Sequence, residues 1–565
     1  MHSIGDGIWQ LFVPGISEGM NYKYKIDTLN GKSLLKADPV AFAAELRPMT
    51  ASVVANIEGF TWTDEKWFDT RPEKSYEHPL NIYEVHLGSW KKDEKGDFLS
   101  YRELADSLPE YAKQMGYTHI EVMPLSEHPL DNSWGYQATG YFAPTSRYGN
   151  PVDLMYFVNK CHEIGIGVIM DWVPGHFCKD DQGLREFDGT FLYEPSHPLR
   201  RNNDGWGTSY FDLGKSRVRS FLLSNACYWL EIFHIDGLRV DAVASMLYLD
   251  YTKSAGQWLP NEYGGRENIE AIKFFQDLNK IIFERNPKAL MMAEESTAYP
   301  MVTWPVHDGG LGFNYKWNMG WMNDVLDYVE VSTVNRRWHH KKLTFSFMYA
   351  FSENFVLPFS HDEVVHGKKS LLDKMPGDYW QMFANLRLLL GYMIAHPGKK
   401  LLFMGQEIGQ FIEWDEKRPL DWFLLGYDLH RLLHDYVKKL NTFYLEESSF
   451  WQVDYDWSGF TWLDADDSEH SIISFIRFDK KGNHVIVVCN FTEVVHDGYR
   501  VGAPQVGPYY EAFNSDETQF GGSGKWGRKI LIANPTPWHG QPNSMVLKLP
   551  PLSVLYIRAG YEKEV

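Results

Sequence analysis

Strand-like and helix-like segments alternate along this chain from residue 79 to about residue 446, and this alternation limits the possible folds more than any other feature. The strand-like runs are 81–87, 118–124, 167–173, 234–243, 290–294, 355–359 and 400–403. The helix-like stretches between them include 101–115, 152–164, 220–233 and 268–285. A further strand, the sixth in chain order, falls between residues 314 and 344, where the pattern does not place it. The alternation predicts an α/β fold in which eight units close into a (β/α)8 TIM barrel.

Both ends of the chain carry more strand signals than helix signals. In residues 1–72, apolar residues alternate from Tyr22 to Ile26, and Asn30-Gly31 marks a hairpin. About three strands are expected there, too few for an independent sandwich, so we predict a partial N-terminal β-sandwich. We assign residues 73–446 to the barrel. Residues 447–565 are predicted to form a C-terminal all-β sandwich with strands at 471–478, 484–490, 544–548 and 553–557.

Charge and cysteine content argue against several classes of function. The net charge of −19 argues against nucleic acid as a partner, whereas a neutral substrate tolerates it. Four scattered cysteines are too few for a disulfide framework or a thiolate metal site. The longest apolar run, 386–395, is about half a membrane span, and no secretory signal opens the chain. We predict a cytoplasmic protein, a monomer or weak oligomer, with no cofactor and no membrane partner.

Charged residues gather at the predicted carboxyl ends of the barrel strands, where barrel enzymes place their chemistry. The residues at these ends are Asp171 and His176, Arg239 and Asp241, Glu294 and Glu295, and Ser360, His361, Asp362 and Glu363. No local rule of strand formation demands this clustering. It therefore favours a catalytic site over a purely structural set of ion pairs.

The run HIDGLRVDAV, residues 234–243, contains the first candidate nucleophile. Alternation after the Asp236-Gly237 turn places Arg239 and Asp241 on one face of a strand. The arginine is expected to keep Asp241 ionised, and an ionised carboxylate can act as a nucleophile. Taken alone, this pair is more often structural, but the other carboxylates of the rim favour catalysis. The strand pattern does not choose between Glu294 and Glu295 as its partner.

Four motifs resemble those of the α-amylase superfamily of glycoside hydrolases. They are DWVPGHF (171–177), GLRVDAV (237–243), MAEEST (292–297) and FSHDEVVHGK (359–368). A closer resemblance, to the 1,4-α-glucan (glycogen) branching enzymes, is carried by WGYQATGYFAPTSRYG (134–149), GQEIGQFIEWDEKRPLDW (405–422) and NSDETQFGGSG (514–524). The resemblance extends from about Gly7 to the end of the chain.

This resemblance implies a role for each residue at the rim. Asp241 is implied as the nucleophile, Glu294, rather than Glu295, as general acid and then base, and Asp362 as the residue that favours distortion of the sugar ring. The implied substrate-binding residues are Trp134, Tyr136, Asp171, His176, Arg239 and His361. The implied reaction cleaves an α-1,4 bond of an α-glucan by a retaining double displacement and transfers the chain to a 6-hydroxyl. The same two-carboxylate chemistry underlies retaining glycosidases.

Two other functions use the same fold. A hydrolase, whether amylase or debranching enzyme, shares the chemistry up to the covalent intermediate, so only the branching-enzyme motifs argue against it. A non-catalytic binding or transport-accessory protein could dispense with the carboxylates, which this chain keeps.

The chain departs from the resemblance at two places. Amylases of the superfamily often carry a calcium-binding Asn before the motif-one histidine, but Gly175 stands here, so we predict no metal site. Branching enzymes usually begin with a complete β-sandwich carbohydrate-binding module. Residues from Gly7 to about Asn56 resemble only its C-terminal half.

Overall fold

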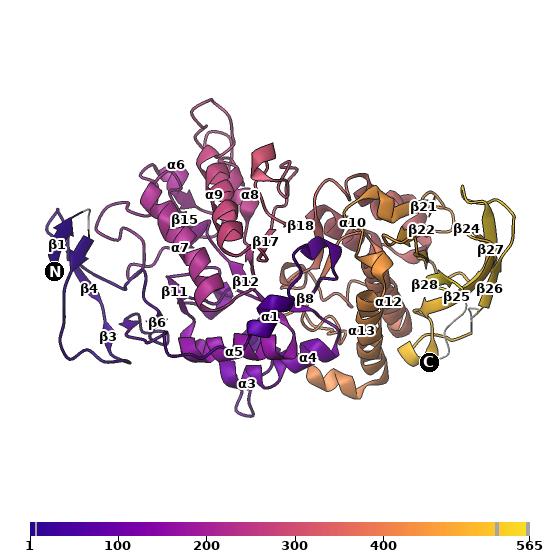
Figure 1. The fold of residues 1–565 in the computed structure, drawn as a ribbon, viewed down its shortest axis with the longest axis horizontal. Helices are drawn as coiled ribbons and strands as arrows, with labels where there is room; N and C mark the ends of the chain where they lie inside the picture. The colour runs from indigo at the N-terminus through magenta and orange to yellow at the C-terminus, as the bar shows by residue number, and fades with distance from the viewer. Residues whose placement is uncertain (6–7, 526–529, 561–565) are drawn as a thin grey trace.

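Eight parallel strands form a closed barrel at the centre of the protein, as seen in a computed structural model that describes residues 1–5, 8–525 and 530–560 (Figure 1). Gly7, where the family resemblance begins, lies outside the described residues. The barrel strands are β8 Asn81–Val85, β9 His119–Val122, β12 Gly167–Trp172, β16 Gly237–Val240, β17 Leu290–Ala293, β18 Tyr315–Trp317, β19 Phe355–Phe359 and β20 Lys399–Phe403. The last strand pairs with the first, Leu401 opposite Ile82, which closes the sheet. The predicted (β/α)8 barrel is confirmed.

Apolar side chains fill the barrel interior. They include Ile82, Ile169, Met292, Trp317, Val356 and Leu401. The outer faces of the same strands are buried under helices. Because both faces are buried, such strands consist of nearly continuous apolar residues, which is why most of them can be located in the sequence.

Helices cover most of the outer face of the barrel. They are α3 Tyr101–Ala105, α4 Leu108–Gln114, α5 Pro151–Ile164, α7 Ser216–Ile232, α9 Ile269–Arg285, α10 Met319–Val329, α12 Tyr379–Ala395 and α13 Asp428–Glu446. The single helix predicted over 101–115 is wrong, because the chain forms two helices there. Pro109 lies in the first turn of α4, where a proline is tolerated, whereas in a continuous helix it would remove a hydrogen bond.

The fourth barrel strand is shorter than the predicted run 234–243. It ends at Val240, and Ala242 adopts a left-handed conformation with φ of 48°. The short helix α8, Val243–Leu247, follows at once. Asp241 therefore lies just beyond the strand, in the turn, although it remains beside Arg239.

The sixth barrel strand, β18, lies inside the interval that the sequence left open. It has only three residues, and two of them pair with each neighbouring strand. The segment 294–314, all of it described, contains no α-helix and only the 3₁₀ turn η4, Val306–Asp308. This flank of the barrel is consequently covered by an irregular loop.

Small sheets make up the N-terminal part, at the indigo end of Figure 1. They are the pair β1 His2–Gly5 and β2 Ile8–Gln10, the pair β4 Tyr24–Asp27 and β5 Ser33–Lys36, and the group β3 Asn21–Tyr22, β6 Ala43–Ala44 and β7 Ser52–Val53. Lys36 ties this part to the barrel domain by donating to the carbonyl oxygens of Asp181 and Arg185, at 2.7 and 2.6 Å. The Asn30-Gly31 hairpin joins β4 to β5 as predicted.

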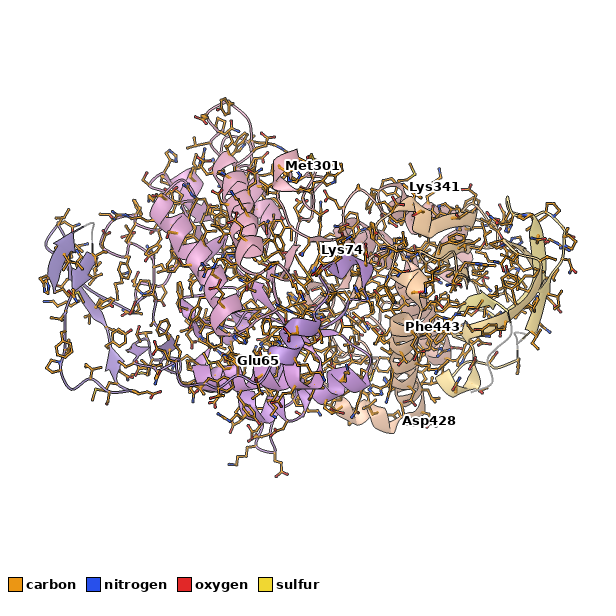
Figure 2. The ribbon with its side chains drawn as sticks, viewed as in Figure 1. Glu65, Lys74, Met301, Lys341, Asp428 and Phe443 are labelled. Atoms are coloured by element: carbon orange, nitrogen blue, oxygen red, sulfur yellow. The ribbon has the colours of Figure 1, made fainter. Side chains whose placement is uncertain are left out.

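The C-terminal part is a sandwich of two antiparallel sheets. One contains β21 Phe460–Asp464, β22 Ile472–Phe478, β23 His484–Asn490, β25 Gly507–Asn514, β26 Ile530–Ala533 and β28 Ser553–Ala559, and the other pairs β24 His496–Ala503 with β27 Asn543–Leu549. Its larger sheet packs on the barrel helices. Figure 2 labels Phe443 of α13 at this junction, where its ring lies 5.3 Å from that of Tyr556. In the part of the chain that is described, no helix has the length and apolar character needed to span a membrane.

Candidate active site

A buried arginine lies at the centre of the carboxyl-terminal rim. Nη1 of Arg239 lies 2.6 and 2.7 Å from the two carboxylate oxygens of Asp171, and 2.9 Å from Oδ1 of Asp241. Its Nη2 lies 3.0 Å from Oε2 of Glu294. The guanidinium packs over the ring of Trp317, 4.4 Å from the ring centroid. One cation thus joins Asp171, within β12, to Asp241 and Glu294, which directly follow the neighbouring strands β16 and β17.

Strand register and the turn at Ala242 bring these groups together. Asp171 on β12 lies directly opposite Arg239 on β16. The left-handed turn directs the backbone N–H of Ala242 to Oε2 of Glu294, at 2.7 Å. A donor of this kind fixes the carboxylate against Asp241. The unusual backbone conformation of Ala242 is therefore part of how the site is built.

Glu294 and Glu295 lie in different environments. Glu294 lies in the cleft with Asp241. Glu295 is buried behind the rim, where Lys316 donates to it at 2.7 Å and the backbone N–H of Thr297 donates at 2.9 Å. The side chain of Glu295 is thus engaged in a separate ion pair outside the barrel interior.

A carboxylate beneath the rim orients His361. Nδ1 of His361 lies 2.5 Å from Oε1 of Glu84, and its Nε2 lies 3.5 Å from Oδ1 of Asp362. Burial alone would lower the pKa of His361, but Asp362 and Glu84 raise it to about 9. Burial alone would raise the pKa of Asp362, but His361 and Arg239 hold it below its ordinary value. At neutral pH the cleft therefore contains a cationic histidine between two carboxylates.

Two further predicted residues, His176 and Tyr136, line the same cleft. Nε2 of His176 lies 4.0 Å from Oδ2 of Asp241, and burial lowers the pKa of this histidine to about 4. The hydroxyl of Tyr136 donates to Asp171 and lies 3.3 Å from Nε2 of His361. His176 is therefore a neutral imidazole at pH 7, and the ring of Tyr136 stacks on that of His361 with the centroids 5.7 Å apart.

Trp134 joins two of the motifs noted in the sequence. Its Nε1 donates to Oε2 of Glu416 at 3.2 Å, and its ring centroid lies 4.9 Å from that of Trp414 and 5.8 Å from that of His361. The segments 134–149 and 405–422, far apart in the chain, thus meet at the edge of the cleft. All nine predicted site residues lie on this one rim.

Three carboxyl groups of the rim, Asp171, Asp241 and Glu294, bind protons more readily than isolated carboxyls. Burial raises the pKa of Asp241 well above its ordinary value; Arg239 opposes this, while Glu294 and Asp171 add to it. Burial likewise raises the pKa of Glu294 against the effect of Arg239. The expectation that Arg239 keeps Asp241 ionised is therefore not met in full, because burial raises the pKa of Asp241 despite Arg239 and one guanidinium serves several carboxylates that titrate together.

Three residues of the cleft were missed in the sequence. Glu84 and Trp317 lie within apolar strands, and the ring of Trp206 lies 5.0 Å from that of His176. A signal for Glu84 exists, because a carboxylate in a strand that is buried on both faces needs a partner. No comparable signal marks Trp206, which lies in a loop.

The position next to His176 that could carry a calcium ligand is filled by apolar atoms. A side chain at Gly175 would meet Cγ and Sδ of Met246 at 3.1 and 3.2 Å. Among residues 1–5, 8–525 and 530–560, no group of three His, Cys, Asp or Glu side chains could hold a metal ion.

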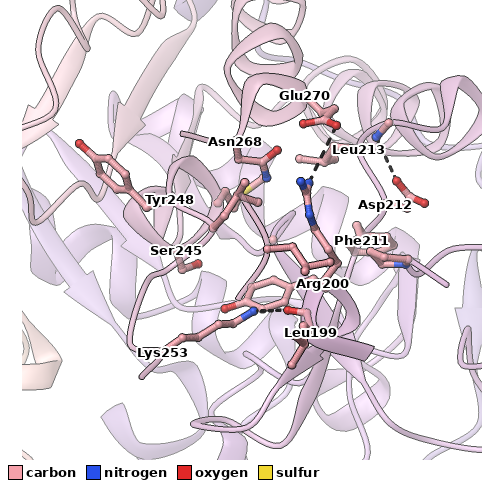
Figure 3. A pocket seen from close by; sticks show the side chains of 17 residues that line it. Leu199, Arg200, Phe211, Asp212, Leu213, Ser245, Tyr248, Lys253, Asn268 and Glu270 are labelled. Carbon is pink, nitrogen blue, oxygen red and sulfur yellow. Dashed lines mark hydrogen bonds and ion pairs between the residues drawn. The ribbon is translucent and has the colours of Figure 1, made fainter. Parts of the chain in front are cut away.

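A small cavity of about 90 Å³ lies beside Gly175 and Ser245 (Figure 3). Its charged side chains already have partners. Lys253 donates to the carbonyl of Leu199 at 2.6 Å, and Arg200 lies 4.0 Å from Glu270. This cavity does not contain the carboxylates of the rim.

The barrel with its rim of carboxylates defines a carbohydrate-active enzyme of the α-amylase type, and family models agree. Residues 82–188 match the alpha amylase catalytic domain, residues 462–560 the alpha amylase C-terminal all-beta domain, and residues 1–41 carbohydrate-binding module 48, the isoamylase N-terminal domain. An α-amylase from Geobacillus thermoleovorans, solved with acarbose, shares the fold, with a TM-score of 0.61 at 15% identity over 86% of this chain and 99% of its own.

Curated relatives are much more similar in sequence. The chain is 58% identical over 561 residues to the 1,4-alpha-glucan branching enzyme GlgB of Halothermothrix orenii, covering 99% of this chain and 89% of the relative. It is 54% identical over 562 residues to the GlgB of Oceanobacillus iheyensis, covering 99% and 88%. The chain belongs to the family of 1,4-α-glucan branching enzymes, which are glycosyltransferases.

Proposed function

We propose that the rim around Arg239 cleaves an α-1,4-glucosidic bond of an α-glucan with retention and transfers the released chain to a 6-hydroxyl. The observation that carries the assignment of residues is that Asp241 and Glu294 bind the same guanidinium, at 2.9 and 3.0 Å, while Glu295 is paired with Lys316. Retaining enzymes hold their two carboxyl groups about 5–5.5 Å apart, and a shared arginine favours so short a separation.

In the first step, Asp241 attacks the anomeric carbon while Glu294 donates its proton to the glycosidic oxygen. The bond between the anomeric carbon and the glycosidic oxygen breaks, and the reducing-end chain leaves with the proton on that oxygen. A covalent glycosyl ester forms on Asp241. Burial raises the pKa of Glu294, as a general acid near neutral pH requires, but it raises that of Asp241 as well, so the two roles are assigned from the family motifs and not from these pKa shifts.

In the second step, the carboxylate of Glu294 removes the proton from a 6-hydroxyl, whose oxygen attacks the anomeric carbon and releases Asp241. Two inversions at that carbon retain the α configuration and give an α-1,6 branch. The sugar in the cleft is held by Asp362, His361 and His176 and rests on the ring of Tyr136. These groups fix the geometry of attack.

The acceptor distinguishes a branching transferase from a hydrolase. Water is present at high concentration, so an acceptor chain must be held in place to compete with it. Good positioning provides effective molarities of about 10⁵ M or more. Membership of the branching-enzyme family favours the sugar hydroxyl as acceptor.

Incubation with amylose tests this function. Transfer breaks one bond and makes one, so iodine absorbance should fall while reducing ends hardly rise. A debranching enzyme added afterwards should then release many new reducing ends. A rise of reducing sugar in step with the loss of iodine colour would instead identify a hydrolase.

We further propose glycogen, amylose and amylopectin-like chains as substrates and a cytoplasmic protein that is a monomer or weak oligomer. Neutral glucans are compatible with the net charge of −19. The four cysteines, all within described residues, form no disulfide, and Cys161 and Cys489 are buried. Unpaired thiols are typical of a reducing compartment.

A further inference from the structure

A large cavity lies on the barrel flank where the connection between β17 and β18 lacks an α-helix among the described residues. Its volume is about 700 Å³, within the range of about 300–1,000 Å³ that small-molecule sites occupy. We call it the flank groove, lined among others by Tyr299, Trp304, Asn318, Phe345, Tyr349 and Phe355. Figure 2 labels Met301, which lines the groove, and Lys341, which begins the segment that contributes Phe345 and Tyr349.

Two exposed aromatic rings line the flank groove from different segments. Trp304 is 47% exposed and Phe345 is 58% exposed. The indole of Trp304 is fixed by donating from Nε1 to the carbonyl of Ser352 at 3.2 Å. The ring of Phe345 lies 5.9 Å from that of Tyr349. Exposed apolar surface gathered around a cavity marks a binding site more often than chance exposure does, and aromatic faces stack on the apolar faces of glucose rings.

A buried amide offers an unused hydrogen bond in this groove. Oδ1 of Asn318 accepts from the backbone N–H of Trp321 at 2.9 Å and from the hydroxyl of Tyr349 at 3.4 Å. Its Nδ2 is buried and has no partner among the described residues. An unpaired buried donor is costly, so a ligand that supplies an oxygen would stabilise it.

The charged groups of the groove favour a neutral ligand. Glu295 and Lys316 pair with each other at 2.7 Å. Glu353 accepts from the backbone N–H groups of Val302 and Thr303, at 2.9 and 2.7 Å. Asp324 also lines the groove, so the charge left uncompensated is negative and disfavours an anion. A neutral polyhydroxylated chain, whose hydroxyls can donate to carboxylate oxygens, fits such a surface better than an anionic ligand does.

Two residues that line the groove, Glu295 and Ser296, directly follow the general acid Glu294 in the chain, so the groove begins next to that side of the rim. The acid protonates the oxygen of the leaving chain, so the leaving chain extends from the cleaved bond on the Glu294 side. The acceptor chain takes the same side in the second step. We propose that the flank groove binds a segment of the α-1,4-glucan chain on this side, an inference that rests on the proposed function.

Hydrogen exchange on the full chain tests this site without turnover. The probe is maltoheptaose, and the protein is the Asp241→Asn variant, which cannot form the covalent intermediate. Peptides that cover 296–304 and 345–349 should exchange at least about threefold more slowly with maltoheptaose, in addition to peptides of the rim. Slowing at the rim alone would overturn the flank groove as a glucan site. No slowing at either place would overturn both this inference and the proposed function.

Substitutions in the flank groove provide a second test. In the same background, Trp304→Ala and Phe345→Ala should remove the slowing at the flank and keep it at the rim. In the active enzyme they should raise the KM for amylose about fivefold with kcat within about twofold, as expected for lost uniform binding. Trp538→Ala, which removes a ring that is 46% exposed on the C-terminal part, is the matched control. It should change neither the slowing of exchange at the flank nor the KM for amylose. If Phe345→Ala folds poorly, Phe345→Leu replaces it in the same measurements, because leucine keeps an apolar side chain but lacks the ring. An unchanged KM in folded variants would contradict the proposal.

Discussion

Oε1 of Glu84 lies 2.5 Å from Nδ1 of His361, and Oε2 of Glu84 accepts from the backbone N–H of His361 at 3.2 Å. This buried carboxylate, on the first barrel strand, therefore fixes both the position and the charge of a histidine at the end of the seventh. The opposite nitrogen of the imidazole faces Asp362 and the cleft. Glu84 thus acts through His361 and is a positioning residue for the site.

Glu84→Gln should shift the alkaline side of the pH–activity profile to lower pH. Asp362 and Glu84 together raise the pKa of His361 to about 9, so loss of one carboxylate lets the imidazole lose its proton at lower pH. We expect an activity loss of about tenfold at pH 7, in line with removal of partners that orient functional histidines. The measurement is kcat/KM on amylose from pH 5 to 10.

Glu121→Gln is the matched control for this change. Glu121 lies directly opposite Glu84 on the neighbouring strand. Burial and the charge of Glu84 raise the pKa of Glu121 well above its ordinary value, which favours the neutral acid that the amide resembles. A pH profile that shifts equally in both variants would rule out a specific effect of Glu84 on His361.

The catalytic carboxylates should differ sharply from Glu295. Asp241→Asn and Glu294→Gln should each fold and lose several orders of magnitude in branching rate, because each removes a group that makes or breaks a bond. Glu295→Gln should keep most of the rate and instead lower the melting temperature, since it leaves Lys316 without its charged partner. Branching rates and thermal unfolding of the three variants decide this. A Glu295 variant less active than the Glu294 variant would reverse the assignment.

Much of the barrel can be predicted because its strands are buried on both faces and form apolar runs. The sequence pattern does not locate β18, because its three residues are too few to show a period. The end of the fourth strand at Val240 was missed because alternation continues through Ala242, and alanine shows no sequence preference for a left-handed turn. Local periodicity thus places elements better than it places their ends.

The sequence predicts which residues form the site better than it predicts how their charges interact. Residues at strand ends converge because parallel strands share a direction, so Asp171, Arg239 and Glu294 can be grouped from the sequence alone. That Arg239 serves three carboxylates depends on side-chain geometry that no sequence pattern reveals. Glu84 acts from inside the barrel, one level below the strand ends at which the other charged residues gather.

The chain should become less stable above pH 8 because of a buried histidine beneath the barrel. His162 lies between Asp64 and Asp236, at 2.8 and 2.9 Å. Burial alone would lower its pKa, but the two carboxylates raise it to about 8. Because the folded pKa exceeds the ordinary value of about 6.5, the stabilisation is complete below pH 6.5 and is lost as pH rises through 8. The difference between the folded pKa of about 8 and the ordinary pKa of about 6.5 corresponds to about 2 kcal/mol of folding stability.

Urea unfolding at pH 6 and pH 9.5 measures this effect, with His162→Gln as the comparison. The free energy of unfolding of the parent should decrease from pH 6 to pH 9.5, and that of the variant should decrease less. The variant should also be less stable at pH 6, because Asp64 and Asp236 lose a charged partner. An identical pH dependence in both proteins would contradict the assignment.

Activity should survive prolonged treatment with a chelator. Met246 occupies the space beside Gly175 in which a metal-binding side chain would lie. We expect the branching rate after dialysis against EDTA to equal the untreated rate. Loss of activity that added calcium restores would reveal a metal site.

The N-terminal part should be the region that opens first. Its sheets are small, and large apolar side chains on it are exposed, among them Phe12 at 85% and Trp9 at 64%. Few buried apolar contacts and many exposed backbone hydrogen bonds are typical of segments that open locally at low free energy. Hydrogen exchange of a monomeric sample should show residues 1–56 exchanging well before the barrel strands. Protection of 1–56 equal to that of β12 and β16, in a monomer, would contradict this expectation. Protection that appears only when the chain associates would mean that another copy covers this face.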